Sequence, residues 1–185
     1  MRVIAGKYKG RVLKGPKHKG VRPTADRVKE ALFNIIGTQI EGADFLDLFA
    51  GTGAIGIEAF SRGAAAVIMV DENSQSIKLI QENCRCLDEA DRARVLHLSS
   101  ERALMVLTNE GHTFDLIFLD PPFEAGLLQK TIQSIARFEL LKSGGWLIAE
   151  HPRLLQLSEV QLTMGDTRYY GDICLTFFKK DSINQ

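Results

Sequence analysis

Short apolar runs and helical patterns alternate along most of this chain. An amphipathic helix is predicted over 26–36, where apolar side chains recur at helical spacing and Gly37 marks the stop. After it, the predicted strands are 45–49, 66–70, 94–98, 115–119 and 146–150, and the predicted helices are 54–62, 74–87, 101–107 and 127–137. The tail, 160–168 and 173–179, predicts an antiparallel hairpin. This alternation favours an α/β fold with a mostly parallel, doubly wound sheet.

The first 22 residues follow a different pattern and carry a strong positive charge. Two short strands, around 2–5 and 11–13, predict a small β-hairpin. The segment has eight basic residues and no acidic one, and because the whole chain has net charge zero, the rest of it carries −8. The basic residues are Arg2, Lys7, Lys9, Arg11, Lys14, Lys17, Lys19 and Arg22. A solvated surface hairpin is one interpretation, but a polyanionic partner such as nucleic acid explains the concentrated charge better.

The composition is that of one ordinary globular domain. The chain has 185 residues, of which 45% are hydrophobic and 25% charged, enough for one sizeable core. Cys84, Cys86 and Cys174 have no C-x-x-C spacing, which argues against a disulfide framework or zinc site and for a cytoplasmic protein. The histidines have no metal-ligand spacing, and no apolar stretch predicts a membrane helix or signal peptide. We expect a monomer, because no heptad pattern is present.

A glycine-rich loop follows the first predicted strand of the alternating region. Gly51, Gly53 and Gly56 have the G-x-G-x-x-G spacing, which permits a tight turn, close backbone approach to a ligand and close helix packing. Asp71 ends the next predicted strand, where a carboxylate can bind a ribose diol. These features suit NAD and S-adenosylmethionine equally well.

The tetrapeptide Asp120-Pro121-Pro122-Phe123 follows the apolar run 114–119. The prolines end the strand, so a carboxylate, a rigid bend and an aromatic ring stand together at its carboxyl end, where ligands bind in open α/β sheets. This motif has no role in hydride transfer, and Asp47, four residues before Gly51, is an acid that dinucleotide loops usually lack. Together they favour S-adenosylmethionine over NAD.

With these motifs the sequence resembles the class I S-adenosylmethionine-dependent methyltransferases that act on exocyclic amines. A closer resemblance rests on the segments 2–6, 10–11, 22–34, 47–56 and 120–123, which include the run Arg22-Pro23-Thr24. In this order and spacing they are similar to the bacterial 16S rRNA guanine-N2 methyltransferase family, the small-subunit methyltransferase D, over essentially the whole chain. The sequence departs from the family at Ser99 and Ser100, where members often have Asp or Asn and then Ala.

The resemblance implies a Rossmann-like class I methyltransferase domain over 23–185, with a seven-stranded, mostly parallel sheet ending in an antiparallel hairpin. Residues 1–22 would form the RNA-binding β-hairpin extension. The implied cofactor is S-adenosyl-L-methionine, and the implied partner is 16S rRNA or a small-subunit assembly particle. The implied reaction is methylation of N2 of a specific guanine, with no metal and no membrane.

The resemblance and the chemistry of the residues together assign the expected site. The expected cofactor-binding residues are Thr24, Asp47, Phe49, Gly51, Gly53, Gly56, Asp71, Ser100 and Asp120. The expected catalytic residues are Asp120 and the Pro121 carbonyl, which would accept hydrogen bonds from the amine, and Phe123, on which the base would stack. The expected RNA-binding residues are Lys7, Lys9, Arg11, Lys14, Lys17, Lys19, Arg22 and Arg27.

Other functions remain open from the sequence alone. Guanine presents two adjacent N–H donors, which a carboxylate can accept. The alternative substrates are adenine or cytosine in DNA, a base in another RNA, or a protein glutamine. A DNA enzyme usually needs an added recognition domain, and the glutamine enzymes resemble Asn-Pro-Pro-Tyr rather than the motif found here. An NAD-dependent oxidoreductase would need a further substrate domain. An inactive RNA-binding protein is disfavoured by the complete motif at Asp120.

Overall fold

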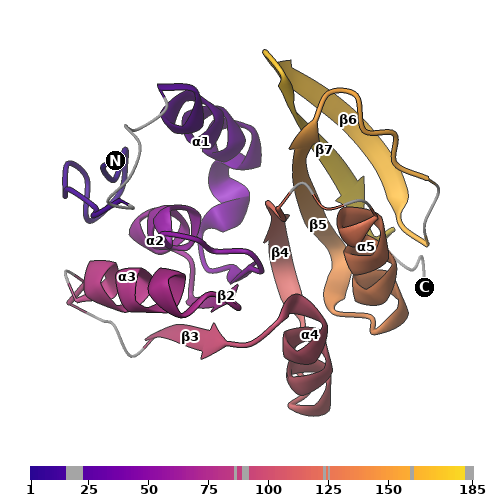
Figure 1. Ribbon diagram of the computed structural model, residues 1–185, viewed down its shortest axis with the longest axis horizontal. Coiled ribbons are helices and arrows are strands. Elements are labelled where there is room, and N and C mark those ends of the chain that lie inside the picture. The colour runs from indigo at the N-terminus through magenta and orange to yellow at the C-terminus, as the bar shows by residue number, and fades with distance from the viewer. Residues whose placement is uncertain are drawn as a thin grey trace.

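The computed structural model describes residues 1–15, 23–85, 87–88, 92–122, 124, 126–158 and 161–181, with the side chains of 23–25 left out. Its centre is a seven-stranded sheet in the order β3-β2-β1-β4-β5-β7-β6 (Figure 1). The strands are β1 Asp44–Asp47, β2 Ala66–Asp71, β3 Ala93–His97, β4 Phe114–Leu119, β5 Leu141–Pro152, β6 Thr163–Tyr170 and β7 Ile173–Lys179. The first five pair in parallel, and β7 is antiparallel to both β5 and β6. The predicted Rossmann-like architecture with a C-terminal hairpin is confirmed.

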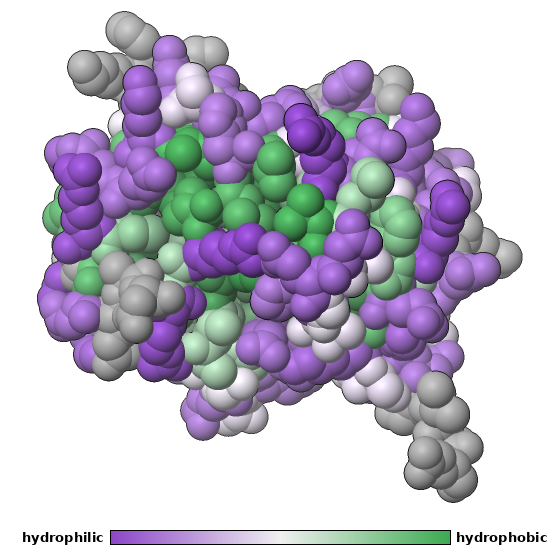
Figure 2. All heavy atoms as spheres, turned by 90° about the horizontal axis from the view of Figure 1, so that it is seen from below, coloured by the Kyte–Doolittle hydropathy of each residue, from purple (hydrophilic) through white to green (hydrophobic). Residues whose placement is uncertain are grey.

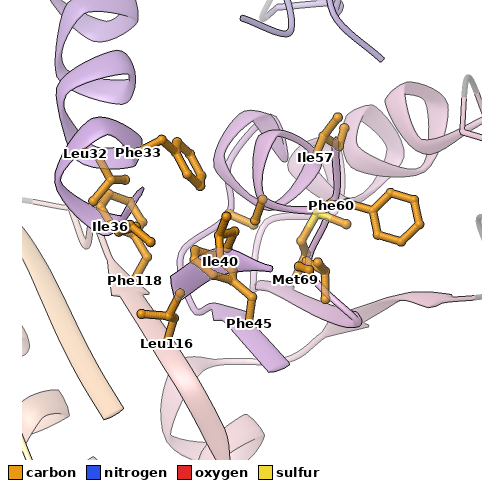
Figure 3. Packing of buried hydrophobic residues seen from close by; sticks show 14 of the residues in the cluster. Leu32, Phe33, Ile36, Ile40, Phe45, Ile57, Phe60, Met69, Leu116 and Phe118 are labelled. Carbon is orange, nitrogen blue, oxygen red and sulfur yellow. The ribbon is translucent and has the colours of Figure 1, made fainter. Parts of the chain in front are cut away.

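Helices cover both faces of this sheet. They are α1 Pro23–Ile36, the short 3-10 helix η1 Gly37–Ile40, α2 Ala54–Ser61, α3 Ser74–Cys84, α4 Ser100–Asn109 and α5 Leu127–Arg137. Strand side chains alternate between two apolar clusters, so Phe118 packs with α1, α2 and α3 while Leu119 packs with α4 and α5. Figure 3 shows Leu32 and Ile36 of α1 lying against Phe118 and Leu116 of β4. The α1 face also forms one wall of the candidate site.

Strand β5 is longer than the sequence predicted. The prediction began it at residue 146, but pairing with β4 already starts at Phe114 and Leu141 and is interrupted by an irregularity before Leu116. The run 143–145 resembles a turn because it contains two glycines. At Gly145 an added Cβ would lie 2.9 Å from the carbonyl oxygen of Asp115, so this glycine permits a close approach of two strands within the sheet.

The N-terminal segment, residues 1–15, packs on α2 and α3 rather than projecting from the domain. Its two arms meet at a single antiparallel bridge between Arg2 and Val12, flanked by the hydrogen bond from Val3 N to Arg11 O at 2.9 Å. Val3, Tyr8 and Leu13 are buried in the same apolar cluster as α1 and α2. The division of the chain at residue 22 stays a prediction, because 16–22 lie outside the described residues.

A buried carboxylate on α2 holds this segment. Glu58 is fully buried, and its two oxygens accept hydrogen bonds from the backbone N–H groups of Ile4 (2.8 Å) and Ala5 (3.0 Å). Two cations compensate its charge, with Lys29 Nζ at 3.3 Å and Arg62 Nε at 2.9 Å. Lys29 also donates to the carbonyl of Arg2 at 2.8 Å. One paired carboxylate therefore links the N-terminal segment, α1 and α2.

A close backbone approach completes the docking. Gly6 has φ +83°, and a Cβ at this position would lie 1.8 Å from the carbonyl oxygen of Ser61. The same carbonyl accepts a hydrogen bond from Lys7 N at 2.8 Å, and the Ser61 hydroxyl donates to Ala5 O at 2.6 Å. Only glycine fits this position without moving the two chain segments apart.

The side of the molecule opposite the carboxyl end of β4 is mostly polar. Figure 2 shows hydrophilic residues covering much of this face and framing a smaller group of hydrophobic ones. Among the residues that the structure describes, no helix has the length and apolar character needed to cross a bilayer. The titratable groups of the candidate site gather at the other edge of the sheet, at the carboxyl ends of the strands.

Gly6→Ala should destabilise the protein by about 3 kcal/mol or more, because the added methyl group overlaps Ser61 O in addition to the strain of positive φ. Gly10→Ala is the matched control, since Gly10 has φ +85° and nothing lies within 4 Å of its added Cβ. It should cost only about 1–2 kcal/mol. Urea unfolding and amide exchange at Val3 would measure both effects. Equal destabilisation in the two variants would contradict the close approach of Gly6 to Ser61.

Candidate active site

The glycine-rich loop between β1 and α2 is held by two acidic side chains. The Asp71 carboxylate accepts hydrogen bonds from Gly51 N and from Asn73 N, both at 2.8 Å. The Asp47 Oδ2 atom accepts from Gly56 N at 3.0 Å. At Gly56 an added Cβ would lie 2.6 Å from Met69 Cγ, so α2 packs closely on β2. The G-x-G-x-x-G pattern therefore forms a tight turn with close helix packing, as predicted.

Asp47 is a buried acid with one unsatisfied oxygen. Its side chain is only 1% exposed, and its Oδ1 atom has no hydrogen-bond partner among the described residues. Burial raises its pKa from 3.8 to about 7, with smaller contributions from the charges of Asp120 and Asp71, while the hydrogen bond from Gly56 N lowers it. A buried oxygen of this kind can accept a hydrogen bond from a ligand or a water molecule.

A pocket of about 260 Å³ opens beside this loop, at the carboxyl ends of β1, β4 and β5. Asp47, Asp120 and Glu150 line it from the three strands, and the loop contributes backbone and side chains next to them. The other lining residues are Met1, Asp26, Val28, Lys29, Leu32, Phe49, Ala50, Gly51, Thr52, Ala54, Ile55 and Phe118. Figure 1 shows α1 on one side of this edge and the β6–β7 hairpin on the other.

Asp120 and Glu150 occupy neighbouring positions on β4 and β5. The register pairs Leu119 of β4 with Ala149 of β5. Asp120 directly follows Leu119, and Glu150 directly follows Ala149. Asp120 is exposed by surface area but lies in a concave site, and loss of solvation raises its pKa to about 6. Desolvation, and then the charge of Asp120, raise the pKa of Glu150 to about 8. The charge of Asp120 acts on Glu150, so the titrations of the two carboxyl groups are linked.

The structure brings together some of the predicted cofactor-binding residues but not all. Asp47, Phe49, Gly51 and Asp120 line the pocket, and Gly53 caps α2 beneath the loop with φ 76°. Asp71 is not among the residues that line the pocket, but its carboxylate accepts a hydrogen bond from Gly51 N of the loop. Ser100 lies instead at the start of α4, where it lines a separate groove of about 530 Å³ between α4 and α5.

Several predicted residues fall where the structure gives no description. Phe123, Lys17, Lys19 and Arg22 lie outside the described residues, as does the side chain of Thr24. Pro121 is buried directly after Asp120, and the carbonyl of Pro122 accepts a hydrogen bond from Glu124 N at 2.6 Å. The bend after β4 is therefore described, while the aromatic ring expected to bind the base is not.

The basic residues of the N-terminal segment are exposed but partly neutralised. Lys7, Lys9, Arg11, Lys14 and Arg27 are all exposed. Arg11 lies 3.9 Å from Asp88, and Lys14 pairs with Glu82. The guanidinium of Arg11 also lies 5.0 Å from the centre of the Tyr8 ring. Acidic residues distant in the sequence thus offset part of the charge that residues 1–22 show in isolation.

Sequence reasoning placed Thr24 of α1 at the site but missed Glu150 and the α1 residues that line the pocket, Asp26, Val28, Lys29 and Leu32. Glu150 ends a predicted strand in the same way as Asp120, so its position at the carboxyl edge was a signal that could have found it. The contribution of α1 depends on how that helix packs across β4, which local sequence does not show. The completed pocket is rich in carboxylates, and such a site binds a cationic or hydrogen-bond-donating ligand.

Comparison with known proteins places this chain in a family. The family described as Conserved hypothetical protein 95 matches residues 1–179. The Escherichia coli ribosomal RNA small subunit methyltransferase D is 39% identical over 150 residues, covering 81% of this chain and 71% of that protein. The Haemophilus influenzae protein of the same name is 36% identical over 151 residues, covering 81% of this chain and 78% of that protein.

A solved structure with bound ligands is also similar. The Thermus thermophilus 16S rRNA N2 G1207 methyltransferase, in complex with AdoMet and guanosine, superposes with a TM-score of 0.67 at 25% identity. The match covers 89% of this chain and 44% of that one.

Asp47→Asn should stabilise the ligand-free protein at pH 8 by an amount on the order of 1–4 kcal/mol. The folded-state pKa of Asp47 lies above its unfolded value, so folding becomes less favourable as pH rises from 3.8 to about 7. The gain from Asn should therefore grow across that window and level off above it. Urea unfolding at several pH values would measure it.

Asp115→Asn is a control that should change the folding stability in the opposite direction to Asp47→Asn. The Asp115 carboxylate accepts from Lys142 Nζ and Asp44 N, both at 2.8 Å. Desolvation raises its pKa, but these hydrogen bonds and the charge of Lys142 outweigh that effect and lower the pKa overall. Its replacement should destabilise the protein at neutral pH, and this effect should disappear as pH falls through that lowered pKa. A stability difference for Asp47→Asn that is independent of pH would contradict a buried, proton-binding Asp47.

Proposed function

The chain belongs to the rRNA small-subunit methyltransferase D family of class I S-adenosylmethionine-dependent methyltransferases, and we propose that it methylates the exocyclic N2 of a guanine in 16S rRNA. S-adenosylmethionine-dependent methylation of rRNA is the activity that the family supports. The observation that carries the finer proposal is the pocket itself. Asp47, Asp120 and Glu150 converge there, beside a glycine loop and at the end of the Asp-Pro-Pro-Phe strand.

The residues of the pocket fit S-adenosylmethionine. This cofactor carries an ammonium, a sulfonium and one carboxylate, so its net charge is positive, and the site offers carboxylates that no cation among the described lining residues fully neutralises. Lys29 lines the pocket, but it is paired with Glu58 and the carbonyl of Arg2. The unsatisfied Oδ1 of Asp47 is available to a donor from the ligand. We infer that Asp47 and the loop backbone hold the methionine end, and that Asp71 holds the ribose.

Asp120 is placed to act on the nucleophile. An exocyclic amine is a weak nucleophile because its lone pair is delocalised into the ring, and it gains positive charge during attack on a methyl group. The cofactor supplies that methyl group when bound. A carboxylate that accepts the N–H bonds stabilises the developing charge, and the Pro121 carbonyl is proposed to accept the other hydrogen. Phe123 would fix the plane of the base by stacking.

Guanine fits Asp120 better than adenine or cytosine does. The guanine edge presents N1–H and N2–H₂ side by side, and an ionised carboxylate is acceptor-only. The structural relative from Thermus thermophilus, whose name states N2 methylation of a 16S guanine and which was crystallised with guanosine, supports this assignment by similarity. A base within a duplex cannot enter such a pocket, so the target nucleotide would be unpaired or flipped out.

The exposed N-terminal cations are proposed to bind RNA phosphates. Lys7 and Lys9 lie on the turn that joins the two arms of the docked segment, and Met1 of the same segment lines the pocket. The hydrogen bonds to Glu58 fix this segment next to the pocket. RNA bound there would have its phosphates near these cations while the target base enters the site.

Incubation with labelled S-adenosylmethionine and naked 16S rRNA, assembled small subunits or duplex DNA, followed by nucleoside analysis, would test the function. We expect label in N2-methylguanosine from one of the RNA samples. Asp120→Ala should lower the rate at least about 100-fold, because the charge on the amine loses its acceptor. Calorimetry should show cofactor binding within about fivefold of wild type, a change of about 1 kcal/mol.

The control is Asp166→Ala, which removes a carboxylate whose side chain is 72% exposed on β6 and should keep full activity. Label found only in DNA adenine or cytosine would contradict the guanine assignment. Weakened cofactor binding with preserved turnover at saturating cofactor in Asp120→Ala would contradict the role given to that residue.

The double variant Lys7→Ala/Lys9→Ala should weaken rRNA binding and reduce its dependence on salt. Removing one cation that neutralises a phosphate should reduce the slope of log K against log salt by about 0.7–0.9. The matched control is Lys130→Ala/Lys179→Ala, which removes two exposed cations from α5 and from the distal end of β7. Binding isotherms at several salt concentrations would measure both. An unchanged slope in the first variant would exclude these two lysines from the RNA interface.

A further inference from the structure

Glu150 is a pocket acid to which the proposed chemistry has so far given no role. It follows Ala149 on β5 just as Asp120 follows Leu119 on β4, and these two strands are adjacent and parallel. Neighbouring parallel strands are about 4.8 Å apart, so Asp120 and Glu150 are neighbours at the pocket wall, and the charge of Asp120 acts on Glu150. Both line the same cavity of about 260 Å³.

The surroundings of Glu150 do not neutralise this pair. The charged groups of the residues that line the pocket from other elements are the carboxylates of Asp47 on β1 and Asp26 on α1, the Lys29 ammonium on α1 and the α-amino group of Met1. Lys29 is 3.3 Å from Glu58 Oε2, and no other Lys, Arg or His side chain is among the described residues that line the pocket. Leu175, the neighbour of Glu150 on β7, is apolar and fully buried. Ionising both of these adjacent carboxyl groups costs free energy, because the two negative charges repel each other.

We propose that Asp120 and Glu150 share one proton, and that protonated Glu150 donates a hydrogen bond to the ring acceptor beside the reacting amine while ionised Asp120 accepts from the donor side. This inference rests on the proposed guanine specificity and adds a second base-binding residue to it. Asp120 and Glu150 would then be a matched acceptor and donor built from two identical functional groups with different protonation, as in other pairs of enzyme carboxyls.

The electrostatics of the pair agree with this division. The pKa values of the pair lie at about 6 and about 8, both raised chiefly by burial, so near neutral pH it holds one proton. Glu150 is the member with the higher value because the charge of Asp120 adds to its desolvation. The positive charge of a bound sulfonium would lower the pKa of both Asp120 and Glu150. Asp120 would then stay ionised, and Glu150 would lose its proton at a lower pH than in the free protein.

The resulting pattern matches one base edge. Around its exocyclic amine, guanine presents N1–H as a donor, N2–H₂ as a donor and N3 as an acceptor. An ionised Asp120 suits the two donors, and a protonated Glu150 suits the acceptor. Adenine and cytosine have no N–H donor beside their amine, so Asp120 would face an acceptor there. A site built in this way discriminates because the wrong base leaves buried polar groups unpaired.

Glu150→Gln and Glu150→Ala separate this role from a structural one. Glutamine keeps a donor at this position without titrating, so kcat/KM for rRNA at pH 7 should fall less than about tenfold, whereas alanine should cost about 100-fold or more. The wild-type profile of kcat/KM should decline in the alkaline range as Glu150 ionises, and this decline should be absent in Glu150→Gln. Glu139→Gln, which changes an 81% exposed glutamate, is the control for a general effect.

A measurement without cofactor or RNA tests the shared proton directly. Carbon-13 NMR of the carboxyl groups should show Glu150 titrating well above the usual glutamate range in the free protein, and Asp120→Asn should lower that pKa by removing the neighbouring charge. A Glu150 that titrates in the ordinary glutamate range, equal falls in activity for Glu150→Gln and Glu150→Ala, or an alkaline decline retained in Glu150→Gln would each overturn the proposal. A product other than N2-methylguanosine would instead overturn the proposed function while leaving the shared proton standing.

Discussion

The parallel register of β1, β4 and β5 is the constraint on which the site depends. It aligns Asp47 with Phe118 and Leu119 with Ala149, so three acids from segments far apart in sequence reach one edge of the sheet. Parallel strands all end on the same side, and their apolar side chains anchor the register because a slip of one residue would expose the core. The packing that stabilises the fold therefore also sets the positions of the carboxylates.

The buried Glu58 extends this order to the first residues of the chain. A fully buried carboxylate is costly unless its charge is compensated, and here two cations and two backbone N–H groups satisfy it. Because Lys29 is part of this arrangement, the cation that lines the pocket is committed to holding the N-terminal segment. One interaction therefore docks the basic segment and leaves the pocket negative.

The elements were predictable from sequence to the extent that their signals are local. Apolar runs that end in Gly51 or in Pro121 and Pro122 indicated both the strands and the loops that follow them. The early start of β5 was missed because Gly144 and Gly145 resemble a turn, and its pairing depends on the distant β4. Glu150 was missed for the same reason, since only the adjacency of β4 and β5 makes it a neighbour of Asp120. Ser100 was assigned by resemblance, and the structure places it in a different groove.

The acidity of the pocket has a thermodynamic consequence for ligand binding. Burial raises the pKa of Asp47 to about 7 and that of Glu150 to about 8, so the empty site is destabilised as these groups ionise. A cationic ligand relieves that repulsion and its binding in turn stabilises the fold. The pocket acids would therefore contribute to holding S-adenosylmethionine through its positive charge, and ligand binding and carboxyl ionisation would be linked because both involve one cluster of acids.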